Sequence, residues 1–110
     1  MNFESDRLTK AEQRVIACLL QDTRALMHCP NLMPNDFRHG LHGSIFATIR
    51  ALIKDGQPVN VPSVHAYLCK WWRLTDAGIA AYLEALGDIK VRPLREVGYF
   101  VATMRDGKWS

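Results

Sequence analysis

Between residues 9 and 56 the chain reads TKAEQRVIACLLQDTRALMHCPNLMPNDFRHGLHGSIFATIRALIKDG, in which two apolar helical patterns flank a turn. In the first pattern, apolar residues recur every three or four positions from Ala11 to Leu20, which places them on one face of a helix. Thr9 followed by Glu12 has the S/T-x-x-E form of a capping box, so we expect this helix to begin just after Thr9. The stretch therefore predicts a helical fold.

The second apolar pattern follows a turn at residues 33–37 and predicts the longest helix, from about Asp36 to Lys54. Its apolar positions step by four at Phe37, Leu41, Ile45 and Ile49. Gly40 and Gly43 interrupt the pattern, and each glycine costs about 1 kcal/mol relative to alanine in a helix interior. We therefore expect a break or a close packing contact near these glycines, and Gly56 provides a left-handed residue after the helix end.

Four further helical segments complete the pattern. A short one is expected at residues 23–28. Asn60 is a suitable N-cap for a helix with an apolar stripe at Val64, Tyr67, Leu68 and Trp71. After Thr75 and Asp76, a helix carries a stripe at Ile79, Tyr82, Leu83 and Leu86. A last helix opens at Pro93, should stop near residues 106–107, and has a stripe at Leu94, Val97, Val101 and Met104.

No segment shows a convincing strand alternation, so the sequence predicts an all-α fold, a compact bundle of about six helices. With 110 residues, of which 48% are hydrophobic, the chain can bury one core of ordinary size. We expect a flexible N-terminus at residues 1–8, a single helical domain at residues 9–106 and a tail at residues 107–110.

Charge and cysteine content restrict the classes of function. The net charge of +3 is a mild basic bias with both signs scattered along the chain, which is not by itself typical of a nucleic-acid-binding protein. No apolar run approaches the roughly 20 residues of a membrane span, and no signal peptide is evident, so we expect a cytoplasmic protein without a membrane partner. Cys18, Cys29 and Cys69 form no C-x-x-C pair, so neither a disulfide framework nor a zinc ribbon is indicated.

Five sequence blocks in a fixed order point to a family. They lie at residues 11–20, 33–37, 42–46, 55–61 and 81–86. They resemble the N-terminal domain of DnaB-type replicative DNA helicases, including its G-x-P-V-D turn and its A-Y-L-x-x-L helix. The resemblance extends over roughly residues 9–106.

The resemblance implies an all-helical bundle without an activity of its own. In that family the domain pairs with copies of itself in a collar above the motor ring, and it contacts primase and loading factors. The expected function is thus a non-catalytic protein–protein interaction module of DNA replication, with the replicative helicase, a primase, a loader or a second copy as partner. The family continues into a helical hairpin that builds the dimer contacts, whereas this sequence stops at Ser110. It could be a helicase fragment or a free-standing factor of phage or plasmid type, and its two ends favour the second origin.

Motifs for chemistry are absent from the sequence. A helicase motor needs the phosphate loop G-x-x-x-x-G-K-[ST], and here Gly107-Lys108 is followed by Trp109. We therefore expect no enzyme activity, no catalytic residue and no cofactor. His28, Cys29, His39 and His42 are of types that bind zinc, but Gly40 loosens the only regular spacing among them, so surface histidines are the expectation and no metal site is predicted.

The predicted partner surface lies mainly on the last helix. Its aromatic residues exceed what one buried stripe requires, which favours a contact surface, although core burial explains the same pattern. The candidate partner-binding residues are Arg95, Tyr99, Phe100, Met104 and Trp72. Trp72 lies in a run of cations and aromatics at residues 70–73 that could also stack bases, whereas Trp71 continues a buried stripe.

A second class of function remains open at this point. Small basic helical domains often bind DNA directly, and the helices near residues 61–71 and 77–86 could form a helix-turn-helix. Against this, Asp76, Ala77, Gly78 and Ala80 would give the reading helix few groups to bond bases or phosphates.

Overall fold

Five α-helices and two short 3-10 helices make up the fold in the computed structural model, which describes residues 6–109. In chain order they are α1 (Arg7–Gln21), the 3-10 helices η1 (Thr23–His28) and η2 (Pro34–Asp36), α2 (Gly40–Lys54), α3 (Val61–Trp71), α4 (Gly78–Gly87) and α5 (Pro93–Trp109). Within these residues there is no strand, which confirms the all-α prediction. The short segment expected at residues 23–28 is present as η1.

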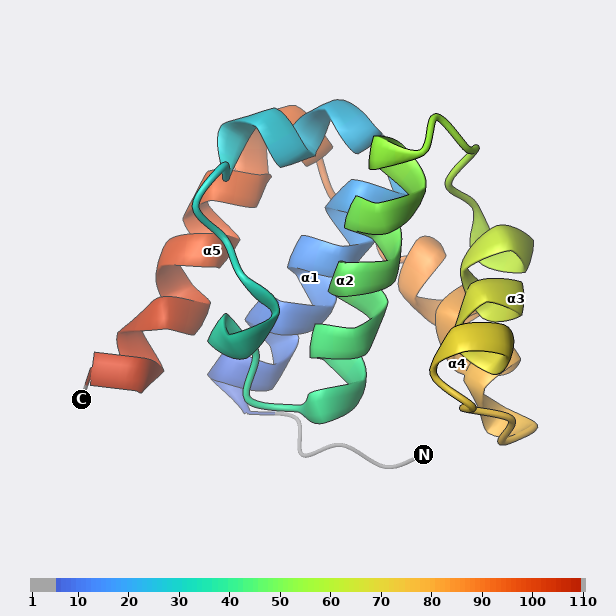
Figure 1. The fold of residues 1–110 in the computed structure, drawn as a ribbon. Coiled ribbons are helices and arrows are strands. Elements are labelled where there is room, and N and C mark those ends of the chain that lie inside the picture. Colours follow the sequence, from blue (N-terminus) through green and yellow to red (C-terminus); the bar gives the residue numbers. More distant parts are fainter. Residues whose placement is uncertain (1–5, 110) are drawn as a thin grey trace.

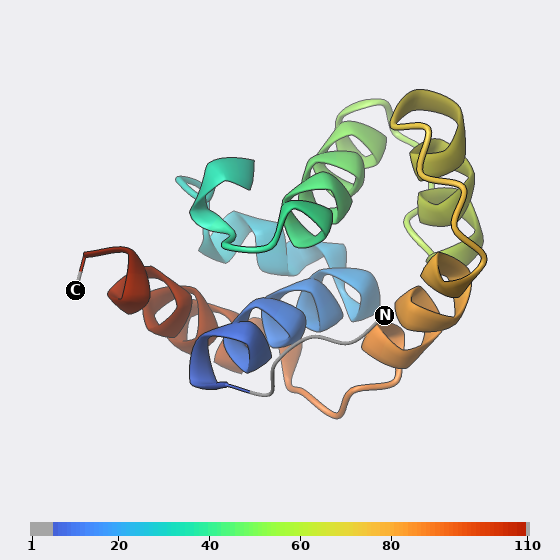
Figure 2. The same ribbon diagram turned by 90° about the horizontal axis from the view of Figure 1, so that it is seen from below.

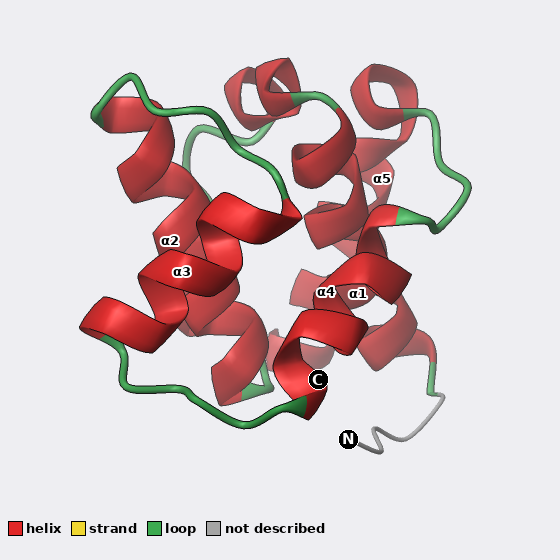
Figure 3. Ribbon diagram, turned by 90° about the vertical axis from the view of Figure 1, so that its right-hand side faces the viewer, coloured by secondary structure: helices red, strands yellow, loops and turns green. Residues whose placement is uncertain are grey.

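Helix α1 lies at the centre of the bundle (Figures 1 and 2). It packs against α5 along most of its length and against α2 and α4 on its other sides. Helix α3 packs against both α2 and α4, as the view from the side of α3 and α4 shows (Figure 3). The segment containing η1 and η2 bridges α2 and α5. The core between these elements is apolar and includes Val15, Ile16, Phe46, Leu68 and Leu83, all without exposure to solvent.

The start of α1 differs from the prediction. Asp6 is the N-cap, and its Oδ1 accepts a hydrogen bond of 2.7 Å from the backbone N–H of Thr9. The predicted capping box of Thr9 and Glu12 is therefore wrong, because Glu12 is fully buried and directed into the bundle. Since α1 begins at Arg7, the predicted flexible segment at residues 1–8 is also wrong at residues 7–8, and its residues 1–5 lie outside the described part of the chain.

The two glycines near the start of α2 have different structural roles. The predicted long helix is divided, because η2 ends at Asp36 and α2 begins at Gly40. A Cβ atom placed on Gly43 would lie 2.9 Å from the carbonyl oxygen of Pro34, whereas one placed on Gly40 would meet nothing within 4 Å. The break and the close contact expected from the sequence are both confirmed.

The link from α2 to α3 follows the prediction, but the end of α3 does not. Gly56 has a φ of 69° after α2, and the Asn60 side chain accepts a hydrogen bond of 2.9 Å from the N–H of Ser63. Trp71, predicted to be buried, is 64% exposed. Trp71 is the last residue of α3; the chain then turns at Arg73, which has a φ of 56°, and Leu74 packs against the core.

The last helix is longer than predicted, since α5 continues to Trp109 instead of stopping near residue 107. The predicted tail at residues 107–110 is thus helical up to residue 109, and Ser110 lies outside the described residues. Val97, Val101 and Met104 form its buried face, as predicted. None of the helices in residues 6–109 combines the length and the apolar composition that crossing a bilayer requires.

Candidate functional site

Helix α5 presents an aromatic surface to solvent. Tyr99 is 71% exposed, and Arg95, one helical turn earlier, is also exposed. Phe100 is half-buried and its ring contacts that of Tyr99 edge-on, with centroids 5.6 Å apart. The structure thus brings three of the predicted partner-binding residues together on one helix.

A groove lies between this surface and α1. Its wall on α5 consists of Tyr99, Phe100 and Thr103, and its volume is about 170 Å³. The wall on α1 consists of Arg7, Lys10, Ala11 and Arg14. The guanidinium carbon of Arg14 lies 5.9 Å from the centroid of the Phe100 ring, a distance at which a cation is attracted to the face of an aromatic ring. We call this feature the α1/α5 groove.

Met104 does not belong to this surface. Its side chain is 1% exposed and is part of the hydrophobic core, so the prediction that it contacts a partner is corrected. Met104 lies three and seven residues after the buried Val101 and Val97, which places all three on the same side of α5.

Trp72, the remaining candidate, lies elsewhere. It is 43% exposed and lines a separate pocket of about 280 Å³ with Pro34, Phe37, Arg38 and Gly40. This pocket shares no lining residue with the α1/α5 groove. The structure therefore confirms Trp72 as a surface residue but separates it from Tyr99 and Phe100.

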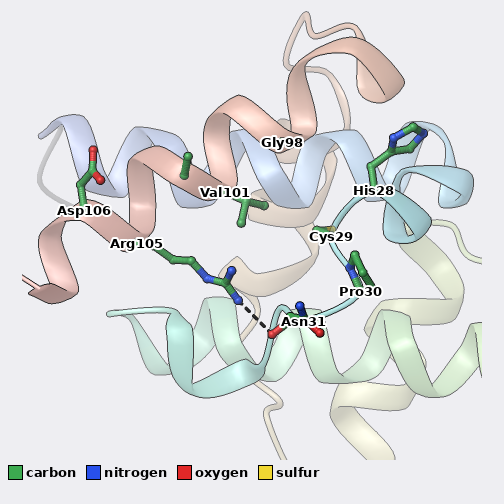
Figure 4. A pocket seen from close by; sticks show the side chains of 9 residues that line it. His28, Cys29, Pro30, Asn31, Gly98, Val101, Arg105 and Asp106 are labelled. Carbon is green, nitrogen blue, oxygen red and sulfur yellow. Dashed lines mark hydrogen bonds between the residues drawn. The ribbon is translucent and has the colours of Figure 1, made fainter.

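A further pocket lies on another side of α5, facing η1 (Figure 4). It has a volume of about 470 Å³, and Arg105 extends across it. The Arg105 guanidinium donates a hydrogen bond of 2.9 Å to the backbone carbonyl of Asn31 and lies 3.1 Å from a carboxylate oxygen of Asp36. Cys29 is buried here, which raises the pKa of its thiol and disfavours the reactive thiolate. The two interactions of Arg105 hold α5 against the η1–η2 segment, so Arg105 has a structural role here.

A buried polar network crosses the bundle, and the sequence analysis missed it. Oε1 of Glu12 lies 2.8 Å from Nδ1 of His42, and Nε2 of His42 lies 2.5 Å from the hydroxyl of Tyr82. Oε2 of Glu12 accepts a hydrogen bond of 2.7 Å from the backbone N–H of Arg38. Nε2 of Gln13 donates to the Tyr82 hydroxyl over 3.1 Å. The network joins α1, α2 and α4 and the loop before α2.

The network has the order carboxylate, imidazole, hydroxyl, which also occurs in enzymes that activate a nucleophile. Here, however, burial raises the pKa of the Tyr82 phenol and the Glu12 carboxylate raises it further, against a lowering by the bond from Gln13. The phenol therefore keeps its proton at neutral pH. A signal for the network was present in the sequence, because Glu12 lies on the same helical face as the apolar residues Val15 and Ile16.

Two of the histidines expected on the surface, His39 and His42, have internal partners, whereas His28 is exposed as expected. His42 is fully buried in the network described above. Nε2 of His39 lies 2.8 Å from the hydroxyl of Thr9, and the rings of His39 and His42 meet edge-on with centroids 5.3 Å apart. The expectation of polar surface histidines is thus wrong for His42. Among residues 6–106, whose side chains the structure describes, no three potential ligands from His, Cys, Asp and Glu gather in a way that could hold a metal ion.

The exposed face of α4 is unsuited to binding DNA, which disfavours the helix-turn-helix alternative. Ile79, Leu83 and Leu86 are buried, so a groove of DNA would meet the opposite face of the helix. That face is exposed at Ala81, Glu84, Ala85 and Asp88. Two carboxylates among four residues would repel phosphates, and the alanines offer no hydrogen bond to a base.

Comparison with known proteins identifies the family. Residues 5–102 match the family described as DnaB-like helicase N terminal domain. The chain belongs to this family. The crystal structure of the N-terminal domain of DnaB helicase from Mycobacterium tuberculosis resembles this DnaB-like domain with a TM-score of 0.78 at 27% identity, over 89% of this chain and 70% of that chain.

A relative in sequence is the replicative DNA helicase DnaB of Geobacillus stearothermophilus. It is 32% identical over 80 residues, which are 72% of this chain. The matched part is 18% of the length of that helicase. The resemblance to a DnaB-type N-terminal domain, which the five sequence blocks indicated, is therefore confirmed.

Proposed function

We propose that this DnaB-like domain is a non-catalytic protein–protein interaction module of DNA replication. Its partner would be a replicative helicase, a primase or a loader, with self-association as a further mode. It would act in the cytoplasm, either as part of a helicase or as a separate factor of phage or plasmid type. The observation that carries the proposal is the exposed aromatic surface of α5 on a domain of this family.

This surface is suited to protein contacts for a physical reason. The Tyr99 ring, 71% exposed, stands beside the half-buried Phe100 and one turn from the exposed Arg95. Tyrosine and arginine are enriched at the residues that dominate binding energy in protein interfaces. Because the ring is held on a packed helix, its burial by a partner costs little conformational entropy.

The test uses the purified protein as bait for purified replicative helicase and primase, at two salt concentrations and with nuclease added. We expect capture that survives nuclease, and affinity about tenfold lower for Tyr99→Glu. Met27→Glu is the matched control, because Met27 is 81% exposed on η1 and lies outside the proposed surface. Recovery of nucleic acid alone, lost at the higher salt, would contradict the proposal.

The absence of catalysis is tested separately. The sequence has no phosphate loop, so the purified protein should not hydrolyse ATP when no partner is present. Hydrolysis that co-purifies with the protein and persists in a Lys108→Ala variant would contradict this part of the proposal.

A further inference from the structure

The α1/α5 groove combines an apolar floor with a cationic edge. Phe100, Ala11 and the ring of Tyr99 provide apolar surface, and the hydroxyl of Thr103 is already bonded to the Tyr99 carbonyl oxygen over 3.0 Å. The floor of the groove thus offers an entering group carbon surface, and the charged groups lie at its edge. Its volume of about 170 Å³ suits one aliphatic or aromatic side chain.

Three cations line the α1 side of the groove. Arg7, Lys10 and Arg14 are spaced by three and four residues, so they lie in one row over about 10 Å of helix. None of the ion pairs found among the side chains of residues 6–106 involves any of the three. The acidic residues beside them on α1 have other partners: Oδ1 of Asp6 lies 3.5 Å from a guanidinium nitrogen of Arg38, and Glu12 is buried against His42.

We infer that the α1/α5 groove binds an acidic amphipathic helix of a partner protein, which inserts one apolar side chain between Tyr99 and Phe100. Carboxylates on successive turns of that helix face the row of cations, since side chains three or four residues apart on the two helices have matching spacing. The charge complementarity of this edge selects the partner. The inference rests on the proposed function and names the chemistry of the partner for the same site.

A nucleic acid fits the groove less well. Cations and aromatics together can hold single strands, but base recognition there uses stacking on open aromatic faces. Here the Tyr99 ring is open to solvent, whereas the Phe100 ring is half-buried and has Arg14 above it. The Thr103 hydroxyl is already bonded to the Tyr99 carbonyl oxygen, so the floor of the groove has few groups with which to bond a base edge.

The first experiment selects peptides of 16 random residues, displayed on phage, against the purified protein. We expect the selected peptides to be enriched in Asp and Glu around one Leu, Phe or Trp. The dissociation constant of a selected peptide is then measured by fluorescence anisotropy. Selected peptides without acidic enrichment would overturn the inference.

Variants locate the peptide in the groove. Lys10→Glu and Arg14→Glu should each weaken peptide binding about tenfold, because each replaces an attraction by a repulsion at the rim. Lys90→Glu is the matched control: Lys90 is an exposed cation in the loop between α4 and α5, it does not line the groove, and its variant should bind as the unchanged protein does. Circular dichroism of each variant checks that the helices are intact.

Two other occupants give distinct results. If a 16-nucleotide thymidine strand displaces the peptides and loses affinity in the same variants, the groove is a nucleic-acid site and the inference is wrong. If sedimentation velocity shows a dimer that Lys10→Glu dissociates, the occupant is a second copy, which also overturns it.

The inference and the proposed function can fail independently. Capture of helicase or primase that is unchanged in Lys10→Glu and Arg14→Glu would leave the interaction function standing and refute the groove. If the protein selects acidic peptides but captures neither helicase nor primase, the groove inference stands and the proposed function is refuted.

Discussion

Glu12 on α1 and His42 on α2 are joined by a hydrogen bond of 2.8 Å between Oε1 and Nδ1, and neither side chain is exposed to solvent. Glu12 also holds the loop before α2, through the N–H of Arg38, and His42 reaches Tyr82 on α4. These bonds satisfy groups that would otherwise be costly to bury. One buried polar network therefore links three helices of the bundle.

Replacing Glu12 by glutamine should destabilise the domain by about 3 kcal/mol. The amide of glutamine has one acceptor oxygen and would place its NH₂ group against a donor, either the Arg38 N–H or the His42 Nδ1–H. Urea unfolding followed by circular dichroism measures the free energy of unfolding. The matched control is Glu84→Gln at an exposed position of α4, which should change it by less than about 0.5 kcal/mol. Equal effects of the two substitutions would refute the role assigned to Glu12.

Replacing Tyr82 by phenylalanine tests the other end of the network. The change removes the hydroxyl that lies between Nε2 of His42 and Nε2 of Gln13 but keeps the ring. We expect a loss of about 1 to 2 kcal/mol in the free energy of unfolding, because the buried His42 and the partly buried Gln13 each lose a hydrogen bond. Tyr99→Phe, which removes an exposed hydroxyl, is the control and should be nearly neutral. If Tyr82→Phe is as neutral as its control, the hydroxyl does not contribute to stability.

The contact between α2 and η2 can be tested with two glycines. Gly43→Ala should destabilise the domain by about 1 to 3 kcal/mol, since its Cβ would lie 2.9 Å from the backbone oxygen of Pro34 and neither backbone can move freely. Gly40→Ala, three residues earlier, meets open space and should be neutral or slightly stabilising. Thermal unfolding of both variants compares them, and an unfolding midpoint of Gly43→Ala at or above that of Gly40→Ala would contradict the contact.

The sequence predicted the helices well because apolar periodicity records which face of each helix is buried. The prediction failed for side chains whose position is decided by residues outside their own helical pattern. Glu12 fits a capping pattern locally, but its partners Arg38 and His42 lie 26 and 30 residues away, and they draw it into the core. Trp71 continues the buried stripe of α3, yet it is exposed, and after the turn at Arg73 it is Leu74 that packs against the core. Local patterns contain no information on either event.

The same limit applies to the candidate site. Tyr99 and Phe100 could be chosen from the sequence because they exceed the needs of one buried stripe. The groove that they line could not, because half of it comes from Arg7, Lys10 and Arg14, about 90 residues earlier in the chain. On α1 alone, the spacing of these cations is typical of an ordinary solvent-exposed helix face. Only the packing of α5 along α1 places them beside the aromatic rings.

The stability of the domain should fall as the pH rises above about 9. Cys18 is fully buried in α1, and burial, together with the negative charge of Glu96, raises the pKa of its thiol from 9.0 to about 12. Between these two values the unfolded chain loses the thiol proton while the folded chain keeps it. The unfolded state then binds fewer protons, so the free energy of unfolding decreases as the pH rises through this window. Well below pH 9 the Cys18 thiol is protonated in both states and does not make the stability depend on pH. Burial also raises the pKa values of Cys29 and Tyr82, which act in the same direction.

Urea unfolding at intervals of half a pH unit from 7.5 to 10.5 measures this slope. Cys18→Ala should make the decline above pH 9 shallower, because alanine has no proton to lose, even if the small cavity lowers stability at every pH. The comparison uses the slope and not the absolute stability, so the cavity does not affect the conclusion. A Cys18→Ala variant with the same slope as the unchanged protein would show that this thiol does not ionise on unfolding in the expected window.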